Sequence, residues 1–130
     1  MVVFKLDFAK AFDSVSWSSL HSIMLARGFP VLWCNWLDNI FTSSRSAVLL
    51  NGVPGRWIWC VKGLGQGDPL SPYLFLIVAN VLQRLVRRDH VLLHPLVDNA
   101  LCHALQYTDD TILILRADVS VACRLKLILE

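Results

Sequence analysis

The sequence predicts one α+β unit in which a small antiparallel sheet packs on helices. Hydrophobic residues make up 55% of the 130 residues, which is enough to bury a core and excludes a disordered chain. Apolar runs of strand length alternate with runs of helical period. No internal repeat and no linker-like segment divides the chain.

The N-terminal half predicts one strand and two helices. Residues 2–8 are rich in β-branched and aromatic side chains, which indicates a buried strand. Capping residues at 13–16 start a helix that Gly28 ends. Pro30 suits the first turn of a second helix. The apolar side of that helix is predicted to comprise Leu32, Trp33, Trp36, Leu37 and Ile40.

Two short strands and a long helix are predicted next. Residues 46–50 and 57–61 look like strands, and Asn51-Gly52 with Pro54-Gly55 between them indicates a hairpin or a longer turn. A glycine-rich segment, residues 63–69, leads into a helix over 71–88. Ser71 is a suitable cap for that helix, and Pro72 fits its first position.

The last third of the chain predicts a loop, a hairpin and a helix. Residues 89–100 have no clear period and indicate a loop. Residues 105–107 and 111–115 are apolar and flank Thr108-Asp109-Asp110, which predicts a second hairpin. Residues 118–130 have the pattern of a helix.

Composition limits the kinds of partner and site. A net charge of +2 is weak for a nucleic-acid binder, so motifs rather than charge must identify a partner. The four cysteines form no C-x-x-C pair, which favours reduced thiols in an intracellular protein. A further group has no spacing typical of a structural zinc site: His90, His94, Cys102 and His103.

No membrane segment is predicted. Lys5 and Asp7 interrupt the first apolar stretch, so it does not resemble a signal peptide. The longest apolar run, residues 73–82, is shorter than the roughly 20 residues that a spanning helix needs. We expect that run to form a buried helix.

Three carboxylates suggest a divalent cation site. Asp109 and Asp110 are adjacent in a predicted turn, where they repel each other unless a cation lies between them. Asp7 lies near the end of an otherwise apolar strand, where an unpaired charge is costly. If that strand lies beside the hairpin, Asp7 and Asp109 converge on one site. Taken singly, the pair fits a solvated turn and Asp7 fits a cap.

Three segments resemble the palm motifs of non-LTR (LINE-type) retrotransposon reverse transcriptases, especially those of plants. Residues 5–15, KLDFAKAFDSV, resemble the first motif, and residues 63–72, GLGQGDPLSP, resemble the second. Residues 105–110, LQYTDD, resemble the Tyr-x-Asp-Asp box. The order and spacing agree, and the similarity covers nearly the whole chain, so residues 1–130 are expected to be a partial reverse-transcriptase domain, a polymerase palm fragment.

The resemblance implies an RNA-directed DNA polymerase that uses two Mg²⁺ (or Mn²⁺) ions. It makes Asp7 and Asp109 metal ligands, with Asp110 supporting the catalytic site. It places Phe8, Phe12, Gln66 and Gly67 against the nucleotide or template, with Phe12 excluding a ribose 2′-hydroxyl. An RNA template, a DNA primer and deoxynucleotides are the implied partners, and the nucleus is the implied location. The oligomeric state is not indicated.

The sequence departs from the family's pattern at two positions and in its extent. Gly65 replaces an arginine usual in LINE-type sequences, and Thr108 replaces the usual alanine. The family's fingers and thumb fall outside residues 1–130, so we expect the isolated chain to be inactive. The alternatives are a non-catalytic transposon relic or domesticated interaction module, and a group II intron maturase-like enzyme.

Overall fold

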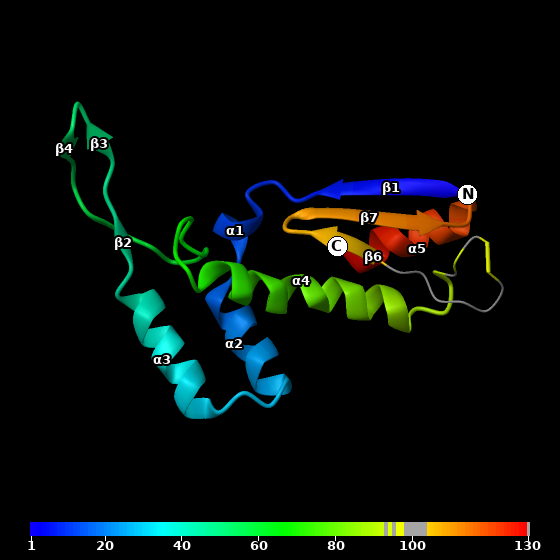
Figure 1. Cartoon of the computed structure of the whole chain (residues 1–130), viewed down its shortest axis with the longest axis horizontal. Helices are drawn as coiled ribbons and strands as arrows, with labels where there is room; N and C mark the ends of the chain where they lie inside the picture. The colour runs from blue at the N-terminus through cyan, green and yellow to red at the C-terminus, as the bar shows by residue number, and fades with distance from the viewer. Residues whose placement is uncertain (93, 95, 98–103, 130) are drawn as a thin grey trace. The chain divides into compact units, whose positions relative to one another are not determined.

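The computed structural model describes residues 1–92, 94, 96–97 and 104–129. The chain divides into two compact units where the sequence predicted one. Unit 1 comprises Met1–Ala9 with Val78–Glu130, and unit 2 is the intervening Lys10–Ile77. The division arises because the segment between the first strand and the long helix builds a core of its own. The α+β class is confirmed, with helices and small antiparallel sheets (Figure 1).

Unit 1 is built on a three-stranded antiparallel sheet of order β1-β7-β6. The strands are β1 (Val2–Asp7), β6 (Ala104–Tyr107) and β7 (Asp110–Leu115), and the predicted C-terminal helix is α5 (Val119–Leu129). The described residues of the loop predicted over 89–100 form no helix or strand, while residues 93, 95, 98–100 and Glu130 lie outside the described residues. One face of the sheet packs on the unit's buried core, which comprises Val86, Leu92, Ala104, Leu113, Leu115, Val121 and Leu125.

The two faces of this sheet differ because side chains alternate along each strand. In β1, Val2, Phe4 and Leu6 pack against the core, while Lys5 and Asp7 are exposed. The prediction of a fully buried strand was therefore wrong: β1 is an edge strand covered on one face only. The other face is open to solvent, so polar side chains on it keep their hydration and have no desolvation penalty.

Unit 2 contains three complete helices and the first residues of a fourth, the long helix described below. The complete helices are α1 (Ala11–Ser14), α2 (Trp17–Ala26) and α3 (Val31–Thr42). Ser16 caps α2 by accepting a hydrogen bond from the Ser19 amide, as the sequence predicted. The buried side chains of this unit are Ala11, Val15, Leu20, Met24, Cys34, Leu37, Phe41, Leu64, Leu74 and Phe75.

The predicted apolar side of α3 was largely wrong. The buried residues are Cys34, Leu37 and Phe41, which follow one another at helical spacing. Leu32, Trp36 and Ile40 are exposed instead. Apolar residues thus form two overlapping rows along α3, and the row that begins at Cys34 is the buried one.

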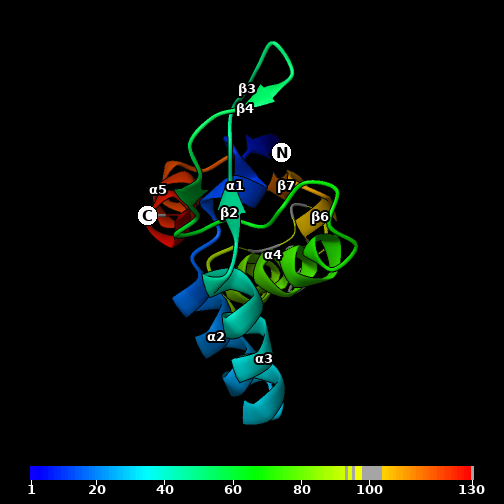
Figure 2. The same cartoon turned by 90° about the vertical axis from the view of Figure 1, so that its left-hand side faces the viewer.

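Residues 45–62 form an arm of two successive strand pairs. β2 (Arg45–Ser46) pairs with β5 (Ile58–Trp59), and β3 (Leu49–Leu50) pairs with β4 (Val53–Pro54). The turn is Asn51-Gly52, whose φ values of 50° and 81° fit a type I′ hairpin. The hairpin prediction is confirmed, although Pro54 lies in a strand rather than in the turn. The arm projects away from α2 and α3 in both views (Figures 1 and 2).

Helix α4 (Ser71–Arg88) has the bounds that the sequence predicted. Ser71 is already inside the helix, and the Asp68 carboxylate accepts the hydrogen bond from the Leu70 amide at 2.8 Å. The helix is amphipathic rather than buried, since Tyr73 and Leu76 are exposed. No helix in the described part of the chain is long and apolar enough to cross a membrane.

Cys34, Cys60 and Cys123 are free thiols, as expected. Cys102 and His103, two members of the group considered for zinc, lie outside the described residues.

Candidate functional site

The register of β1 and β7 brings two of the predicted carboxylates together in unit 1. Asp7 is the direct antiparallel partner of Asp110, and Asp110 is in turn the partner of Tyr107 on β6. Directly opposed residues share a face of the sheet, so these three side chains form a row across the open face. Asp7 is exposed and Asp110 is half-buried. The sheet therefore places two acidic groups at one end of its uncovered side.

Asp109 lies in the two-residue turn that joins β6 to β7. Thr108, the first residue of that turn, has a φ of 52°, which is rare for a β-branched residue and costs about 1–3 kcal/mol. Its Oγ1 lies 2.8 Å from the Tyr107 carbonyl oxygen and 2.8 Å from Asp109 Oδ1, and its one hydrogen can be donated to either. The substitution of threonine for alanine thus adds a hydroxyl that orients Asp109.

The Thr108 hydroxyl also affects the acidity of Asp109. Its hydrogen bond lowers the pKa of the Asp109 carboxyl below the usual range, with help from a backbone hydrogen bond and the charge of Lys5. Asp109 is therefore held in the ionised form that a cation needs.

Lys5 is the basic group of this cluster, and no role at the site was predicted for it. It pairs with Ile112 across the ladder, and its Nζ reaches Asp110 Oδ1 at 3.1 Å. The hydrogen bond to Asp110 raises the pKa of the Lys5 ammonium, and the charges of Asp110, Asp7 and Asp109 add to that effect. Both partners of this ion pair are largely exposed, so the pair is weak and easily exchanged.

The carboxylates suit a divalent cation by their chemistry but are not assembled into a finished site. Within the described residues, no three carboxylate, imidazole or thiol side chains lie close enough together to hold an ion. Asp110 is engaged by Lys5, and Asp109 lies within reach of Thr108. The expected convergence of Asp7 and Asp109 therefore goes no further than the backbone, which sets Asp7 opposite Asp110 and leaves Asp109 in the adjoining turn. Hard carboxylate oxygens are the ligands that Mg²⁺ and Mn²⁺ prefer.

In unit 2, backbone hydrogen bonds tie the start of the glycine-rich segment to the end of the first motif. The Gly63 amide donates to the Val15 carbonyl at 2.8 Å, and the Leu64 amide donates to the Phe12 carbonyl at 2.9 Å. Trp17 Nε1 donates to the Gly63 carbonyl at 2.7 Å. Two motifs that are separated by about fifty residues in the sequence are thus joined through their backbones.

Gly63 cannot be replaced without moving this junction. Its φ is 93°, and a Cβ there would lie 2.9 Å from the Asp13 carbonyl oxygen. Gly67 also has a positive φ, of 88°, but faces open space, and Gly65 has ordinary contacts. The sequence drew attention to Gly67, whereas the glycine that the structure requires most strictly is Gly63.

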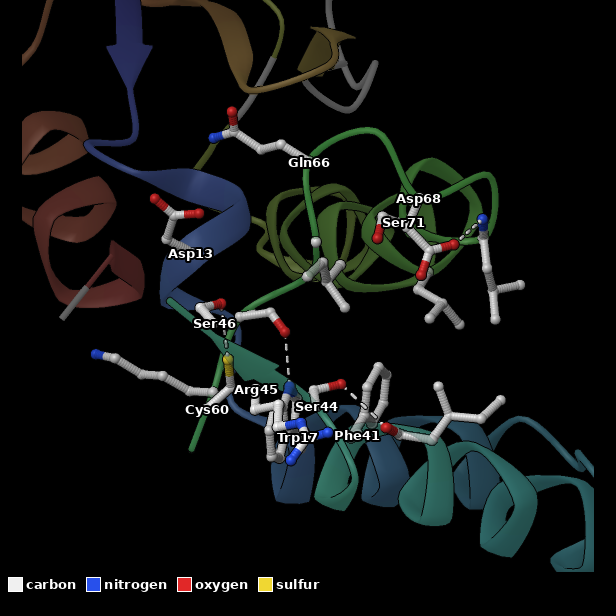
Figure 3. A pocket seen from close by; sticks show the side chains of 17 residues that line it. Asp13, Trp17, Phe41, Ser44, Arg45, Ser46, Cys60, Gln66, Asp68 and Ser71 are labelled. Atoms are coloured by element: carbon white, nitrogen blue, oxygen red, sulfur yellow. Dashed lines mark hydrogen bonds between the residues drawn. The ribbon is translucent and has the colours of Figure 1, made fainter. Parts of the chain in front are cut away.

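Gln66 lines a pocket of about 700 Å³ in unit 2. Figure 3 shows Asp13 from α1, Arg45 and Cys60 from the base of the arm, and Asp68 and Gln66 from the glycine-rich segment around it. Arg45 and Lys62 give the pocket two basic groups, and Asp13 and Asp68 give it two acidic groups. The pocket is therefore polar without favouring one sign of charge. Gly67 does not line it.

The two predicted phenylalanines occupy different settings. Phe8 follows β1 in unit 1 and is exposed. Phe12 lies in α1 of unit 2 and is half-buried, with its ring stacked on that of Phe75 at a centroid distance of 4.3 Å. The predicted site residues thus fall into two groups, with Asp7, Phe8, Asp109 and Asp110 in unit 1 and Phe12, Gln66 and Gly67 in unit 2.

Comparison with known proteins finds, over the whole chain, the family that the three motifs resemble. The family described as reverse transcriptase (RNA-dependent DNA polymerase) matches residues 1–130. The chain is 32% identical over 108 residues to the Pol polyprotein of the type-2 retrotransposable element R2DM of Drosophila melanogaster, covering 83% of the chain and 10% of that protein. It is 38% identical over 81 residues to the Pol polyprotein of the type-1 retrotransposable element R2 of Nasonia vitripennis, covering 62% of the chain and 8% of that protein.

A shorter similarity leads to a plant protein. An uncharacterized mitochondrial protein of Arabidopsis thaliana is 50% identical over 40 residues, which cover 31% of the chain and 33% of that protein. The chain spans about a tenth of the length of the R2 relatives. These matches leave the plant origin a prediction and give no support to a group II intron maturase. The chain belongs to the reverse transcriptase (RNA-dependent DNA polymerase) family and, within it, to the non-LTR retrotransposon type.

Proposed function

We propose that the carboxylate end of the unit 1 sheet is the nucleotidyl-transfer centre of an RNA-directed DNA polymerase. The observation that carries this proposal is the register that sets Asp7 opposite Asp110, with Asp109 in the adjoining turn. These three carboxylates would hold two Mg²⁺ or Mn²⁺ ions, with Asp7 and Asp109 as the principal ligands. Bound there, the ions would stabilise charge on the attacking and leaving oxygens of an in-line phosphoryl transfer.

The residues of the chain have distinct tasks in this proposal. Asp110 exchanges its exposed ion pair with Lys5 for a cation, at little cost because such pairs contribute about 0–1 kcal/mol. Thr108 keeps Asp109 ionised and oriented. Phe8, Phe12, Gln66 and Gly67 contact the deoxynucleotide or the template, and Phe12 excludes a ribose 2′-hydroxyl. The RNA template and the DNA primer are the partners of the complete polymerase.

Titration with Mn²⁺ tests the proposal on the chain itself. Mn²⁺ binding, followed by electron paramagnetic resonance, should weaken at least about tenfold in Asp109→Asn and in Asp7→Asn, because each substitution removes a charged ligand. Asp13→Asn is the matched control, since Asp13 is an exposed acid of unit 2. Equal Mn²⁺ binding by all variants would overturn the metal site and favour the non-catalytic relic.

Primer extension gives a second readout that depends on activity. The isolated chain is expected to be inactive, so this assay uses the complete polymerase, in which oligo(dT) on poly(rA) should be extended only when Asp7 and Asp109 are both kept. Extension that survives Asp109→Asn would contradict the assignment of that residue, whatever the Mn²⁺ titration shows.

A further inference from the structure

The arm of unit 2, residues 45–62, carries a separate concentration of charge. Between Asp38 and Asp68 the sequence contains no acidic residue and three basic ones, Arg45, Arg56 and Lys62. The whole chain has twelve basic and ten acidic residues, so the remainder carries nine against ten. The arm therefore accounts for all of the chain's net positive charge, a distribution that favours a polyanion as partner.

One face of the arm combines that charge with exposed aromatic rings. Arg45 is the direct cross-strand partner of Trp59, so the two side chains share a face, and Trp57 comes just before β5. The Arg45 guanidinium lies over the Trp57 ring, 4.8 Å from its centroid. Trp57 is 56% exposed and Trp59 is 64% exposed. The three side chains thus form one continuous strip, here called the Arg45–Trp59 face.

The chemistry of this face matches a single strand better than a duplex or a protein. Indole rings stack on bases of any sequence, and arginine and lysine contact the phosphates between them. A duplex hides its base faces, so it cannot stack on Trp57 and Trp59, and the net positive charge of the arm favours a polyanion over a protein. The aliphatic tip of the arm, with Leu49, Leu50 and Val53, offers no stacking surface and is not part of the face.

We propose that the Arg45–Trp59 face binds single-stranded RNA, with bases stacking on Trp59 and Trp57 and with Arg45 contacting a phosphate, while Arg56 and Lys62 of the same arm add positive charge that attracts the strand. The identification of this strand as the RNA template rests on the proposed function. The binding itself does not depend on the carboxylate end of the sheet, because every residue of the face lies in unit 2.

Binding of a fluorescein-labelled twelve-nucleotide oligouridine to the whole chain tests this proposal. Trp59→Ala should weaken binding about tenfold or more, since a stacked base contributes about 1–3 kcal/mol. Trp59→Phe should restore most of the loss because it keeps a ring. Trp36→Ala is the matched control, because Trp36 on α3 is 56% exposed, as Trp57 is, but lies outside the arm.

The salt dependence tests the phosphate contacts separately. If the charges of Arg45, Arg56 and Lys62 all act on the bound strand, the slope of log K against log salt should be about −2, and Arg56→Gln or Lys62→Gln should each reduce its magnitude by about 0.7. Lys126→Gln, on α5, is the control and should leave the slope unchanged. A slope that the arm variants do not alter would contradict phosphate binding at this face.

Other outcomes are equally decisive. Equal affinity for oligouridine and oligothymidine supports stacking, whereas binding of DNA alone overturns the assignment to RNA. If Trp59→Ala binds RNA like the parent chain but changes its sedimentation coefficient, the face is a protein interface and the proposal fails. Mn²⁺ binding should be unchanged in every arm variant, so failure here is distinguishable from failure of the proposed metal site.

Discussion

The sheet of unit 1 and the arm of unit 2 differ in how much of their strands is buried. Both consist of antiparallel strands, but the sheet buries one face on a core while the strands of the arm are exposed on both faces. In the sheet, exposure is confined to the face that carries the carboxylates. In the arm, exposed tryptophans, aliphatic residues and basic residues occur together. Exposure on the sheet thus fits the small metal site proposed above, and exposure on the arm fits the broader binding face proposed for it.

The largest expected effect is a difference in stability between a truncation in the sheet and the same truncation in the arm. Leu113, in the central strand β7, is fully buried, and Leu113→Ala should lower the free energy of unfolding by about 2–5 kcal/mol because it leaves a cavity. Leu50, at the tip of the arm, is 74% exposed, and Leu50→Ala should change stability by less than about 0.5 kcal/mol. Urea denaturation measures both. Similar losses in both variants would show that the arm is covered in solution.

The junction at Gly63, where the arm ends, should be as sensitive to substitution as the core. Gly63→Ala combines an unfavourable φ with a 2.9 Å approach to the Asp13 carbonyl oxygen, so we expect a loss of about 2–4 kcal/mol. Gly67→Ala meets only the unfavourable φ and should lose about 1–2 kcal/mol. Gly65→Ala, with ordinary contacts, is the control. Equal melting temperatures for the three would show that the junction is not rigid.

An ion pair between a buried carboxylate and a half-exposed arginine stabilises unit 1. Arg124 Nε donates to Asp89 Oδ2 at 2.6 Å, and the Asp89 side chain is only 6% exposed. Burial acts to raise the pKa of Asp89, but the hydrogen bonds from Arg124 and the Val91 amide outweigh it and the pKa lies below its usual value. Arg124→Met leaves a buried carboxylate without this partner and should cost about 1–3 kcal/mol at pH 7.

The pH dependence of that loss follows from the direction of the pKa shift. A carboxyl whose pKa is lowered by folding stabilises the fold above its unfolded pKa, and this contribution disappears as pH falls through the folded pKa. The difference between the parent chain and Arg124→Met should therefore be largest at neutral pH and shrink below about pH 4. A difference that stays constant down to pH 2 would show that Arg124 acts through packing instead.

The sequence predicted the elements better than their environments. The strands, the Asn51-Gly52 turn and the bounds of α4 follow from local signals, namely alternation, turn residues and capping. Burial depends on which elements meet, and so Leu32 and Trp36 could not be distinguished from Cys34 and Phe41 by periodicity alone. The division into two units also follows from long-range packing.

The candidate site shows the same division between local and long-range information. Motifs identified Asp7, Asp109 and Asp110, and the register placed Asp7 beside Asp110. The roles of Lys5 and Gly63 required three-dimensional contacts, because an ammonium two residues from an aspartate and a glycine in a glycine-rich run are not distinctive in sequence.

The smallest expected effect on stability concerns Lys5. Its pair with Asp110 is exposed, so Lys5→Met should leave the urea midpoint almost unchanged. The same substitution removes a positive charge beside the three carboxylates and frees Asp110, and Mn²⁺ should therefore bind a few-fold more tightly. Lys126→Met, on α5, controls for the change in net charge. Weaker Mn²⁺ binding in Lys5→Met would mean that the ammonium holds Asp110 in place for the cation, whereas tighter binding means that it occupies the position that the cation takes.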